Sequence, residues 1–285
     1  MKQEELMRIQ SIVEDGKNLS YSEKKEYFQT EAFHSESVSV LEQLSYYREN
    51  LYNWYPFQSS DRVLVLGCEC GYLTDFLCQK VKKVVCVEQE KIFSDICNSR
   101  FHQYENFQMV IVDHLLSFAK DEKEEYDIII CDHGIEKYGE ALFEVLKELC
   151  KSTTTVFVSG SNRLGMKYWN GAQTKQYPNL FAGLQQDYVK VEHRLYSRKE
   201  YIKLFARAGF VDDIYEYYPY PDEVFPTAIY SENRLPKVGE LNKQLRDFSE
   251  KKVSFFKENE AFDVVIEQEN FPEFSNGLLF VLQVK

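Results

Sequence analysis

The sequence predicts an α/β protein with a doubly wound, mostly parallel sheet, and three observations support this fold class. Short apolar runs alternate with segments of helical periodicity between residues 61 and 160. The first apolar run ends in a glycine-bounded turn, Gly67–Gly71, and later runs end in carboxylates. Strands and helices that alternate at this spacing are joined by right-handed crossovers, which give a parallel sheet with helices on both faces. Such sheets bind ligands beyond the carboxyl ends of their strands.

Length and charge bound the classes of partner. The chain has 285 residues, enough for one large domain or two modest ones. Its formal net charge is −12, and its short basic clusters are offset by nearby acids. Because a nucleic-acid partner requires a basic surface that neutralises phosphates, we expect no nucleic acid. The first ten residues are polar, unlike a signal peptide, and no apolar run approaches the roughly 18 residues of a membrane helix, so we expect no membrane insertion.

The cysteines indicate a reducing compartment. All seven lie between Cys68 and Cys150, several of them inside apolar runs. An odd number of cysteines without a secretion signal is typical of reduced thiols, so we expect a cytoplasmic protein. Cys68 and Cys70 lack a second ligand pair at zinc spacing, and no metal site is predicted.

Residues 1–60 are predicted to form a polar N-terminal helical segment. Apolar side chains recur in its second half at steps of three and four residues, which predicts one amphipathic helix that Pro56 ends. The apolar stripe of this helix consists of Val38, Leu41, Leu44, Tyr47, Leu51 and Trp54.

The next part of the chain alternates regularly between strand and helix patterns. Short apolar runs predict buried strands at 62–67, 83–88, 107–112, 127–131 and 154–159. Helical periodicity predicts helices at 72–80, 91–101 and 140–150.

The pattern loosens after Gly160. A helix is predicted at 197–208, with Ser197 as its N-cap and Gly209 at its C-terminal end. Strands are predicted at 210–218 and at 278–284, the second of which could return to the sheet edge. Four prolines predict that 219–240 is loop.

These elements predict two parts of the chain. Residues 1–60 form the helical segment, and residues 61–285 form the α/β domain. Within that domain, 161–195 and 219–275 are predicted to be insertion or cover segments, the first because its periodicity is weak.

The turn Gly67–Gly71 is the first candidate for chemistry. Glycine allows a backbone conformation in which the chain approaches a ligand closely, and the following helix N-terminus offers N–H donors. Two glycines after a strand also occur in ordinary tight turns, so this signal is weak by itself.

Carboxylates at later strand ends strengthen the interpretation of this turn as part of a ligand site. Glu88 ends the second predicted strand, where it could accept hydrogen bonds from both ribose hydroxyls of an adenosine cofactor. Asp113 ends the third, where an adenine amino group could bind, and Asp132 ends the fourth. Each could instead be a solvated or capping acid, but the series together favours an adenosine-type site.

Two histidines follow strand ends directly. His114 lies next to Asp113 and His133 next to Asp132. Imidazole titrates near neutral pH, so either could act as a general base on a hydroxyl. The alternative for each is a polar histidine at the rim of the crevice.

The residues from Val63 to Gly71, Glu88, Asp113 and Tyr126–Asp132 together resemble the class I S-adenosylmethionine-dependent methyltransferases. Five further stretches resemble a bacterial subgroup of that family often found beside polysaccharide-building glycosyltransferases. These stretches are Arg48–Pro56, Asn162–Gly171, Tyr217–Asp222, Leu235–Leu241 and Phe271–Asn276.

The resemblance implies a seven-stranded, Rossmann-like methyltransferase sheet with N-terminal helices and a C-terminal cover region. It implies S-adenosyl-L-methionine as the cofactor and methyl transfer to an oxygen or nitrogen of a glycan or glycan precursor, with glycosyltransferases as possible partners. By position, Gly67 and Gly71 would line the methionine end of the cofactor, Glu88 the ribose and Asp113 the adenine, with His114 and Asp132 beside them. Glu136 aligns with an acid on the acceptor side, so His133 and Glu136 are the candidate catalytic residues.

Two other functions stay open. The subgroup usually has an acid at Val65, glycine at Glu69 and an acid at Ser161, so the chain could instead be a catalytically degenerate relative that acts as a binding or scaffolding partner in glycan assembly. A nicotinamide-dependent oxidoreductase is the third hypothesis. The turn lacks the full G-x-G-x-x-G pattern, and Glu69 would repel a pyrophosphate, which favours a cofactor without phosphates.

Overall fold

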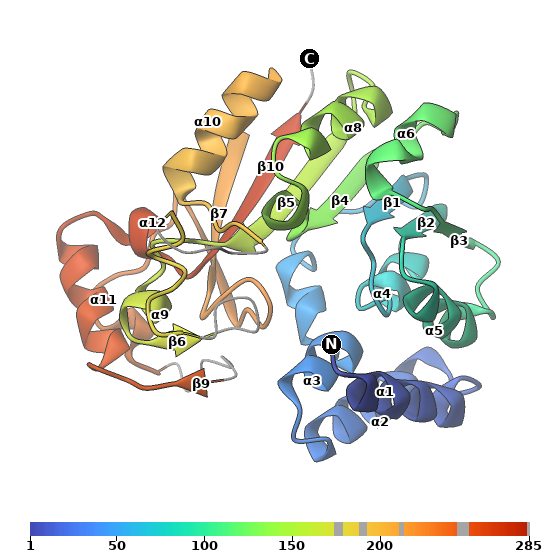
Figure 1. The fold of residues 1–285 in the computed structure, drawn as a ribbon, viewed down its shortest axis with the longest axis horizontal. Coiled ribbons are helices and arrows are strands. Elements are labelled where there is room, and N and C mark those ends of the chain that lie inside the picture. The colour runs from blue at the N-terminus through green and yellow to red at the C-terminus, as the bar shows by residue number, and fades with distance from the viewer. Residues whose placement is uncertain (174–178, 188–192, 211–213, 244–250, 284–285) are drawn as a thin grey trace. The chain divides into compact units, whose positions relative to one another are not determined.

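The structure is a computed structural model that describes residues 1–173, 179–187, 193–210, 214–243 and 251–283. Its main sheet has eight strands in the order β3-β2-β1-β4-β5-β10-β7-β8, and β6 pairs with β9 in a separate two-stranded sheet (Figure 1). The strands of the main sheet are β1 (Arg62–Leu66), β2 (Lys83–Glu88), β3 (Phe107–Ile111), β4 (Ile128–Asp132), β5 (Thr155–Ser161), β7 (Ile214–Tyr220), β8 (Ala228–Ser231) and β10 (Gly277–Gln283).

The predicted α/β class is confirmed, but the sheet is mixed. β1 pairs in parallel with β2 and β4, and β2 pairs in parallel with β3. β7 pairs antiparallel with both β10 and β8. The prediction of seven strands was therefore wrong, because β8 lies inside the segment 219–240 that its prolines marked as loop. Those prolines flank the four-residue strand rather than interrupt it.

The position of β10 also differs from the prediction. It lies between β5 and β7 rather than at an edge of the sheet. Six of its seven residues are buried, which fits a strand covered on both faces. Its run of consecutive apolar residues already had the composition of an interior strand.

Contacts within the chain divide it into two compact units. Unit 1 comprises 1–131 and 145–155, and unit 2 comprises 132–144 and 156–285. The predicted division at residue 60 stays a prediction.

Unit 1 begins with three helices that lie together with α5 (Figure 1). They are α1 (Gln3–Gly16), α2 (Tyr21–His34) and α3 (Val38–Leu44), followed by the 3-10 helix η1 (Tyr46–Leu51). The other helices of the unit are α4 (Thr74–Cys78), α5 (Lys91–Phe101), the 3-10 helix η2 (Leu115–Ser117) and α6 (Phe118–Asp121). The helix α5 has the bounds that the sequence predicted.

The predicted single helix from Val38 to Trp54 was wrong, because Ser45 interrupts it. The backbone of Ser45 is extended, with φ −74° and ψ 146°, and its side chain accepts a hydrogen bond from Tyr47 N. A serine hydroxyl competes with helical hydrogen bonding in this way and caps the next helix instead. Beyond the break the predicted stripe is only partly buried, since Leu51 is buried but Tyr47 and Trp54 are exposed.

A buried polar cluster ties these helices to the turn after β1. Arg100 of α5 is 1% exposed, and its Nη1 donates to the carbonyls of Gln43 and Cys70, each at 3.1 Å. Asp75 accepts from the hydroxyls of Tyr46 and Tyr104 at 2.6 and 2.8 Å. Because Cys70 belongs to the turn, the N-terminal helices help to fix its backbone.

Unit 2 surrounds β5, β10, β7 and β8 with short elements. These are α7 (Gly134–Tyr138), α9 (Met166–Trp169), β6 (Ala172–Gln173), α10 (Arg198–Ala208), η3 (Glu240–Lys243), β9 (Lys251–Lys252), α11 (Glu258–Glu267) and α12 (Phe271–Phe274). The helix α8 (Ala141–Leu149) spans the boundary between the two units. The core of unit 2 is aromatic, with Phe205 of α10 packed edge-on against Phe143 and Phe280.

The predicted start and end of α10 are confirmed. Ser197 and Glu200 form a capping box in which the Glu200 carboxylate accepts from Ser197 N at 2.8 Å. Gly209 ends the helix with φ 87°, a left-handed conformation that glycine adopts without steric cost.

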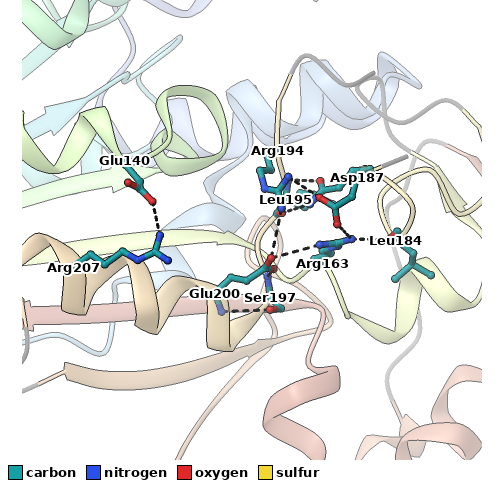
Figure 2. Close-up of polar contacts among 10 residues, drawn as sticks. Glu140, Arg163, Leu184, Asp187, Arg194, Leu195, Ser197, Glu200 and Arg207 are labelled. Atoms are coloured by element: carbon teal, nitrogen blue, oxygen red, sulfur yellow. Dashed lines mark hydrogen bonds and ion pairs between the residues drawn. The ribbon is translucent and has the colours of Figure 1, made fainter. Parts of the chain in front are cut away.

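An ion-pair network joins the segment 161–195 to α10 (Figure 2). Asp187 bridges Arg163 Nη2 at 2.6 Å and Arg194 Nη1 at 2.8 Å, and both arginines approach Glu200. Hydrogen bonds from Arg163, and then from Arg194, lower the pKa of Asp187. The described part of the predicted cover segment is thus anchored to a helix whose own N-terminus is capped.

Across the part of the chain that the structure describes, no helix is both long enough and apolar enough to cross a membrane.

Candidate functional site

The first cluster of candidate residues lies in unit 1, on the turn between β1 and α4. Gly67 and Gly71 have φ values of 73° and 77°. A Cβ at Gly71 would lie 2.2 Å from the ring of Phe101, so packing excludes a side chain there. A Cβ at Gly67 would meet only Leu115, at 4.0 Å, so the space beside this α-carbon is open. An open backbone at the end of a buried strand is what close approach of a ligand requires.

Glu88 connects the end of β2 to this turn. Its side chain is buried, with Oε2 accepting from Glu69 N at 2.9 Å and Oε1 from Gln89 N at 2.8 Å. Burial raises the pKa of Glu88, and the backbone hydrogen bonds act in the opposite direction. Oε1 also lies 3.4 Å from Glu90 N, whereas Oε2 accepts one hydrogen bond from the residues that the structure describes and so retains capacity for a ligand hydroxyl.

Asp113 and His114 follow β3 at the same edge of the parallel strands. Glu88 is in register with Ile111, and Val112 N donates to the Glu88 carbonyl at 3.0 Å. Gln89 Nε2 lies 3.4 Å from the carbonyl oxygen of Asp113. The side chains of Asp113 and His114 are exposed, and the His114 carbonyl accepts from the hydroxyl of Ser117, the last residue of η2. Parallel pairing therefore brings the glycine turn, Glu88 and the Asp113 segment to one edge of unit 1.

Glu69 stands where the resembled subgroup usually has glycine, and it adopts a left-handed backbone with φ 49°. Its carboxylate accepts from Gln43 Nε2 at 2.5 Å and lies 3.7 Å from Arg48 Nη1. Gln43 in turn accepts from Cys70 N through Oε1 at 3.1 Å, and the Arg48 guanidinium stacks 3.3 Å from the ring centroid of Tyr72.

Sequence reasoning assigned no role to Gln43, Arg48 or Tyr72. Arg48 begins the stretch Arg48–Pro56 that carries the resemblance, and Tyr72 directly follows the glycine turn, but no periodicity or spacing linked either one to Glu69. These contacts join segments that are far apart in the sequence, so only the fold reveals them.

The second cluster lies in unit 2, where β4 ends and α7 begins. Asp132 accepts from Ser159 Oγ at 2.6 Å, and His133 N donates to the Ser159 carbonyl at 2.9 Å. His133 has φ 54°, a left-handed conformation that non-glycine residues rarely adopt. Such strained positions concentrate at functional sites, where the surrounding structure holds them.

His133 lies between two carboxylates. Its Nδ1 is 3.3 Å from Glu136 Oε1, and its Nε2 is 3.8 Å from Glu223 Oε1. Ser161 joins the two acids, because its backbone N donates to Glu136 Oε1 at 2.7 Å and its hydroxyl donates to Glu223 Oε1 at 2.5 Å. The candidate pair His133 and Glu136 is thus brought together.

Glu223 is a residue of this cluster that the sequence did not indicate. Its side chain is 1% exposed, and its Oε2 has no hydrogen-bond partner among the described residues. It directly follows Tyr217–Asp222, a stretch that carries the resemblance, and this adjacency was the sequence feature that could have indicated it. Position 161, where the subgroup usually has an acid, here carries a serine that holds a carboxylate from another segment.

Gly160 explains how β5 approaches this cluster so closely. A Cβ there would lie 2.2 Å from the Tyr201 hydroxyl oxygen and 2.9 Å from Glu136 Oε1. Any larger residue would displace Glu136 from the backbone of Ser161. Within the described ranges, no group of three or more histidine, cysteine or acidic side chains is placed to hold a metal ion.

Comparison with known proteins identifies the fold. No protein-family model matches the chain, and no curated protein matches it. A Haloferax volcanii protein assigned as a methyltransferase, solved in complex with the Trm112 methyltransferase activator, has a TM-score of 0.53 at 11% identity, over 90% of this chain and 97% of that one. A Thermotoga maritima SAM-dependent methyltransferase has a TM-score of 0.50 at 11% identity, over 92% of this chain and all of that one (100%).

A geranyl diphosphate methyltransferase solved with SAM has a TM-score of 0.50 at 12% identity, over 90% of each chain. At these identities the likenesses show the fold alone. The chain has the class I fold of SAM-dependent methyltransferases.

Proposed function

We propose that this protein transfers a methyl group from S-adenosylmethionine to an oxygen or nitrogen atom of its acceptor. The observation that carries the proposal is the edge of unit 1, where the glycine turn after β1, the buried Glu88 after β2 and the Asp113 segment after β3 lie together. This is where a sheet of this fold binds a nucleoside.

The residues of that edge fit the adenosyl part of the cofactor. The open space beside Gly67 admits a ligand against the backbone, Glu88 would accept hydrogen bonds from the ribose hydroxyls, and Asp113 would accept one from the adenine amino group. None of these contacts requires a phosphate site, in agreement with the acid at position 69. When bound, the sulfonium cofactor supplies a reactive methyl group, so the protein mainly has to align the acceptor and exclude water.

The cluster in unit 2 would handle the acceptor proton. Glu136 Oε1 lies 3.3 Å from His133 Nδ1, where it would orient the imidazole, and the ring would take a proton from an acceptor O–H or N–H at Nε2. A proton gained at Nε2 would lie close to Glu223 Oε1, 3.8 Å from that nitrogen. Glu136 and Glu223 thus act as positioning residues for His133.

The identity of the acceptor rests on the resemblance. The stretches that resemble the polysaccharide-associated subgroup support a glycan or glycan precursor as acceptor, with glycosyltransferases as partners and a cytoplasmic location. A hydroxyl or amine of such a molecule is a group from which His133 could accept a proton.

A second candidate function is a degenerate relative that binds or scaffolds without catalysis. The observation in its favour is Glu69, whose carboxylate lies on the glycine turn and would crowd a cofactor tail. The two candidates differ in whether the protein binds S-adenosylmethionine.

Calorimetric titration with S-adenosylmethionine and S-adenosylhomocysteine tests the proposal. We expect saturable binding of both, with thermal stabilisation of about 2.7 kcal/mol at a hundredfold excess over the dissociation constant. Asp113→Ala should weaken binding about tenfold or more, since a hydrogen bond to a charged group contributes about 1.5–3 kcal/mol. Asp95→Ala, an exposed acid on α5 that pairs with Lys91, is the matched control and should bind like the wild type. Absence of binding by the wild type would refute the proposal and favour the scaffold.

A further inference from the structure

The two charged side chains of one ion pair at the glycine turn, Arg48 and Glu69, differ in their exposure to solvent. Arg48 is almost fully buried, with 8% of its side chain exposed, whereas its partner Glu69 is 45% exposed. A buried guanidinium needs a counter-charge, and here an accessible carboxylate on the ligand-binding turn supplies it.

The groups that receive this carboxylate are held in place by other contacts. The Arg48 guanidinium is stacked on Tyr72, and Gln43 is fixed through its Oε1 by the backbone N–H of Cys70. The Gln43 amide donates to Glu69 Oε2, and the Arg48 guanidinium lies 3.7 Å from the same oxygen, so an N–H donor and a positive charge both face this carboxylate. This is a preformed carboxylate site filled by the protein's own side chain.

The same residue also contacts the predicted ribose ligand. The backbone N–H of Glu69 donates to Glu88 Oε2 at 2.9 Å, so its side chain begins beside the place where a ribose would bind. A substituent on the 5′ position of that ribose would lie near Gly67, on the turn that carries Glu69. A charge on that substituent would therefore interact with the charge of Glu69.

We infer that Glu69 is a specificity-determining residue that disfavours a carboxylate on the tail of the nucleoside ligand and favours an amine. The inference rests on the proposed function, because it assumes an adenosyl ligand at Glu88. The amino-acid tail of S-adenosylmethionine carries one ammonium and one carboxylate. Glu69 attracts the first, repels the second, and already takes the Gln43 donor and the nearby Arg48 charge that a ligand carboxylate would otherwise use. The preferred ligand class is an adenosine sulfonium or thioether whose tail ends in an amine without a carboxylate.

Three thioether ligands separate these contributions. S-adenosylhomocysteine carries both tail charges, its decarboxylated form S-adenosyl-3-thiopropylamine keeps only the amine, and 5′-methylthioadenosine has neither. For the wild type we expect the decarboxylated ligand to bind about tenfold more tightly than S-adenosylhomocysteine, the size of a like-charge repulsion near a protein surface.

Glu69→Gln keeps the size of the side chain and removes its charge. In this variant the preference should fall to about twofold or less, mainly because S-adenosylhomocysteine binds more tightly, while 5′-methylthioadenosine affinity stays unchanged. Glu69→Gly is the second variant. Glycine adopts the φ of 49° without strain and also lacks the charge, so this variant should show the same loss of preference. Glu105→Gln removes an exposed acid elsewhere in unit 1 and should leave all three affinities as in the wild type.

The outcomes distinguish the inference from the proposed function. If all three ligands bind and their affinity ratios are equal in the wild type and both Glu69 variants, the inference is wrong and the proposed function stands. If the wild type binds none of them, 5′-methylthioadenosine included, both are wrong. Calorimetric titration, with circular dichroism to confirm that each variant is folded, gives these affinities.

Discussion

His133 combines an unusual backbone with a polar environment. A left-handed φ of 54° costs a non-glycine residue about 1–2 kcal/mol, and asparagine is among the few that tolerate it. The imidazole lies within 3.3 Å of one carboxylate and 3.8 Å of another. A histidine kept in this conformation at a strand end is better explained by its side-chain chemistry than by packing, because its side chain is 32% exposed.

The variant His133→Asn tests whether His133 takes the acceptor proton. Asparagine keeps the left-handed backbone but removes the group proposed to take the acceptor proton, so turnover should fall about 10²- to 10⁴-fold. The affinity for S-adenosylmethionine should stay unchanged, since the substitution leaves Gly67, Glu88 and Asp113 as they are. Steady-state kinetics and calorimetric titration measure the two effects.

His102→Asn changes an exposed histidine at the end of α5 and serves as the control. Equal turnover in His133→Asn and in the control would exclude His133 as the base.

The candidate site could be predicted only in part. Glu88, Asp113 and His133 follow apolar runs directly, so their positions at strand ends were visible in the sequence. Glu223 meets Ser161 across 62 positions, and Gln43 meets Glu69 across 26. Contacts of this kind depend on how segments pack, and a single sequence does not encode them as a local pattern.

Among whole elements, predictions succeeded where one local pattern decided the structure. The strand β2 and the helix α5 have their predicted bounds, since a continuous apolar run and a clear helical period define them. Predictions failed where a short-range feature competed with the pattern. Ser45 divides one expected helix, and β8 forms between prolines because its ladder with β7 supplies partners for its backbone.

Ser197→Ala tests the contribution of one helix terminus. The serine hydroxyl accepts a hydrogen bond from Glu200 N, so its loss should lower the free energy of unfolding by about 1 kcal/mol. Urea denaturation followed by circular dichroism measures the change. Ser152→Ala, at an exposed turn position, is the matched control. A loss no greater than in that control would mean that the cap does not stabilise α10.

At the scale of the whole molecule, buried thiols link stability to pH. Burial raises the pKa of Cys150 to about 12, and Cys70 and Cys78 are shifted upward for the same reason. A thiol whose pKa is higher in the folded than in the unfolded state stabilises the fold fully at pH values below about 8.5. That stabilisation is lost as pH rises toward the folded-state pKa, because the unfolded chain ionises first.

We therefore expect the free energy of unfolding to fall as pH rises above about 8.5, by up to about 1.4 kcal/mol per pH unit for each such thiol. Urea denaturation at pH 7.5, 9 and 10 in the presence of a reductant measures this slope. Cys150→Ser removes one titrating group and should reduce the pH dependence of the free energy of unfolding by up to about 1.4 kcal/mol per pH unit. The same slope in this variant and in the wild type would contradict the assignment.

The place of β10 between β5 and β7 has a consequence for biosynthesis. A ribosome delivers β7 and β8 before β10, so the hairpin of these two strands emerges while the strand that joins it to β5 is still missing. During that interval, β5 and β7 each expose an unpaired edge, the kind of surface at which nascent chains aggregate. Folding of this half of the sheet cannot be completed during translation until its last strand has left the ribosome, and the interval before that is when a chaperone would be needed.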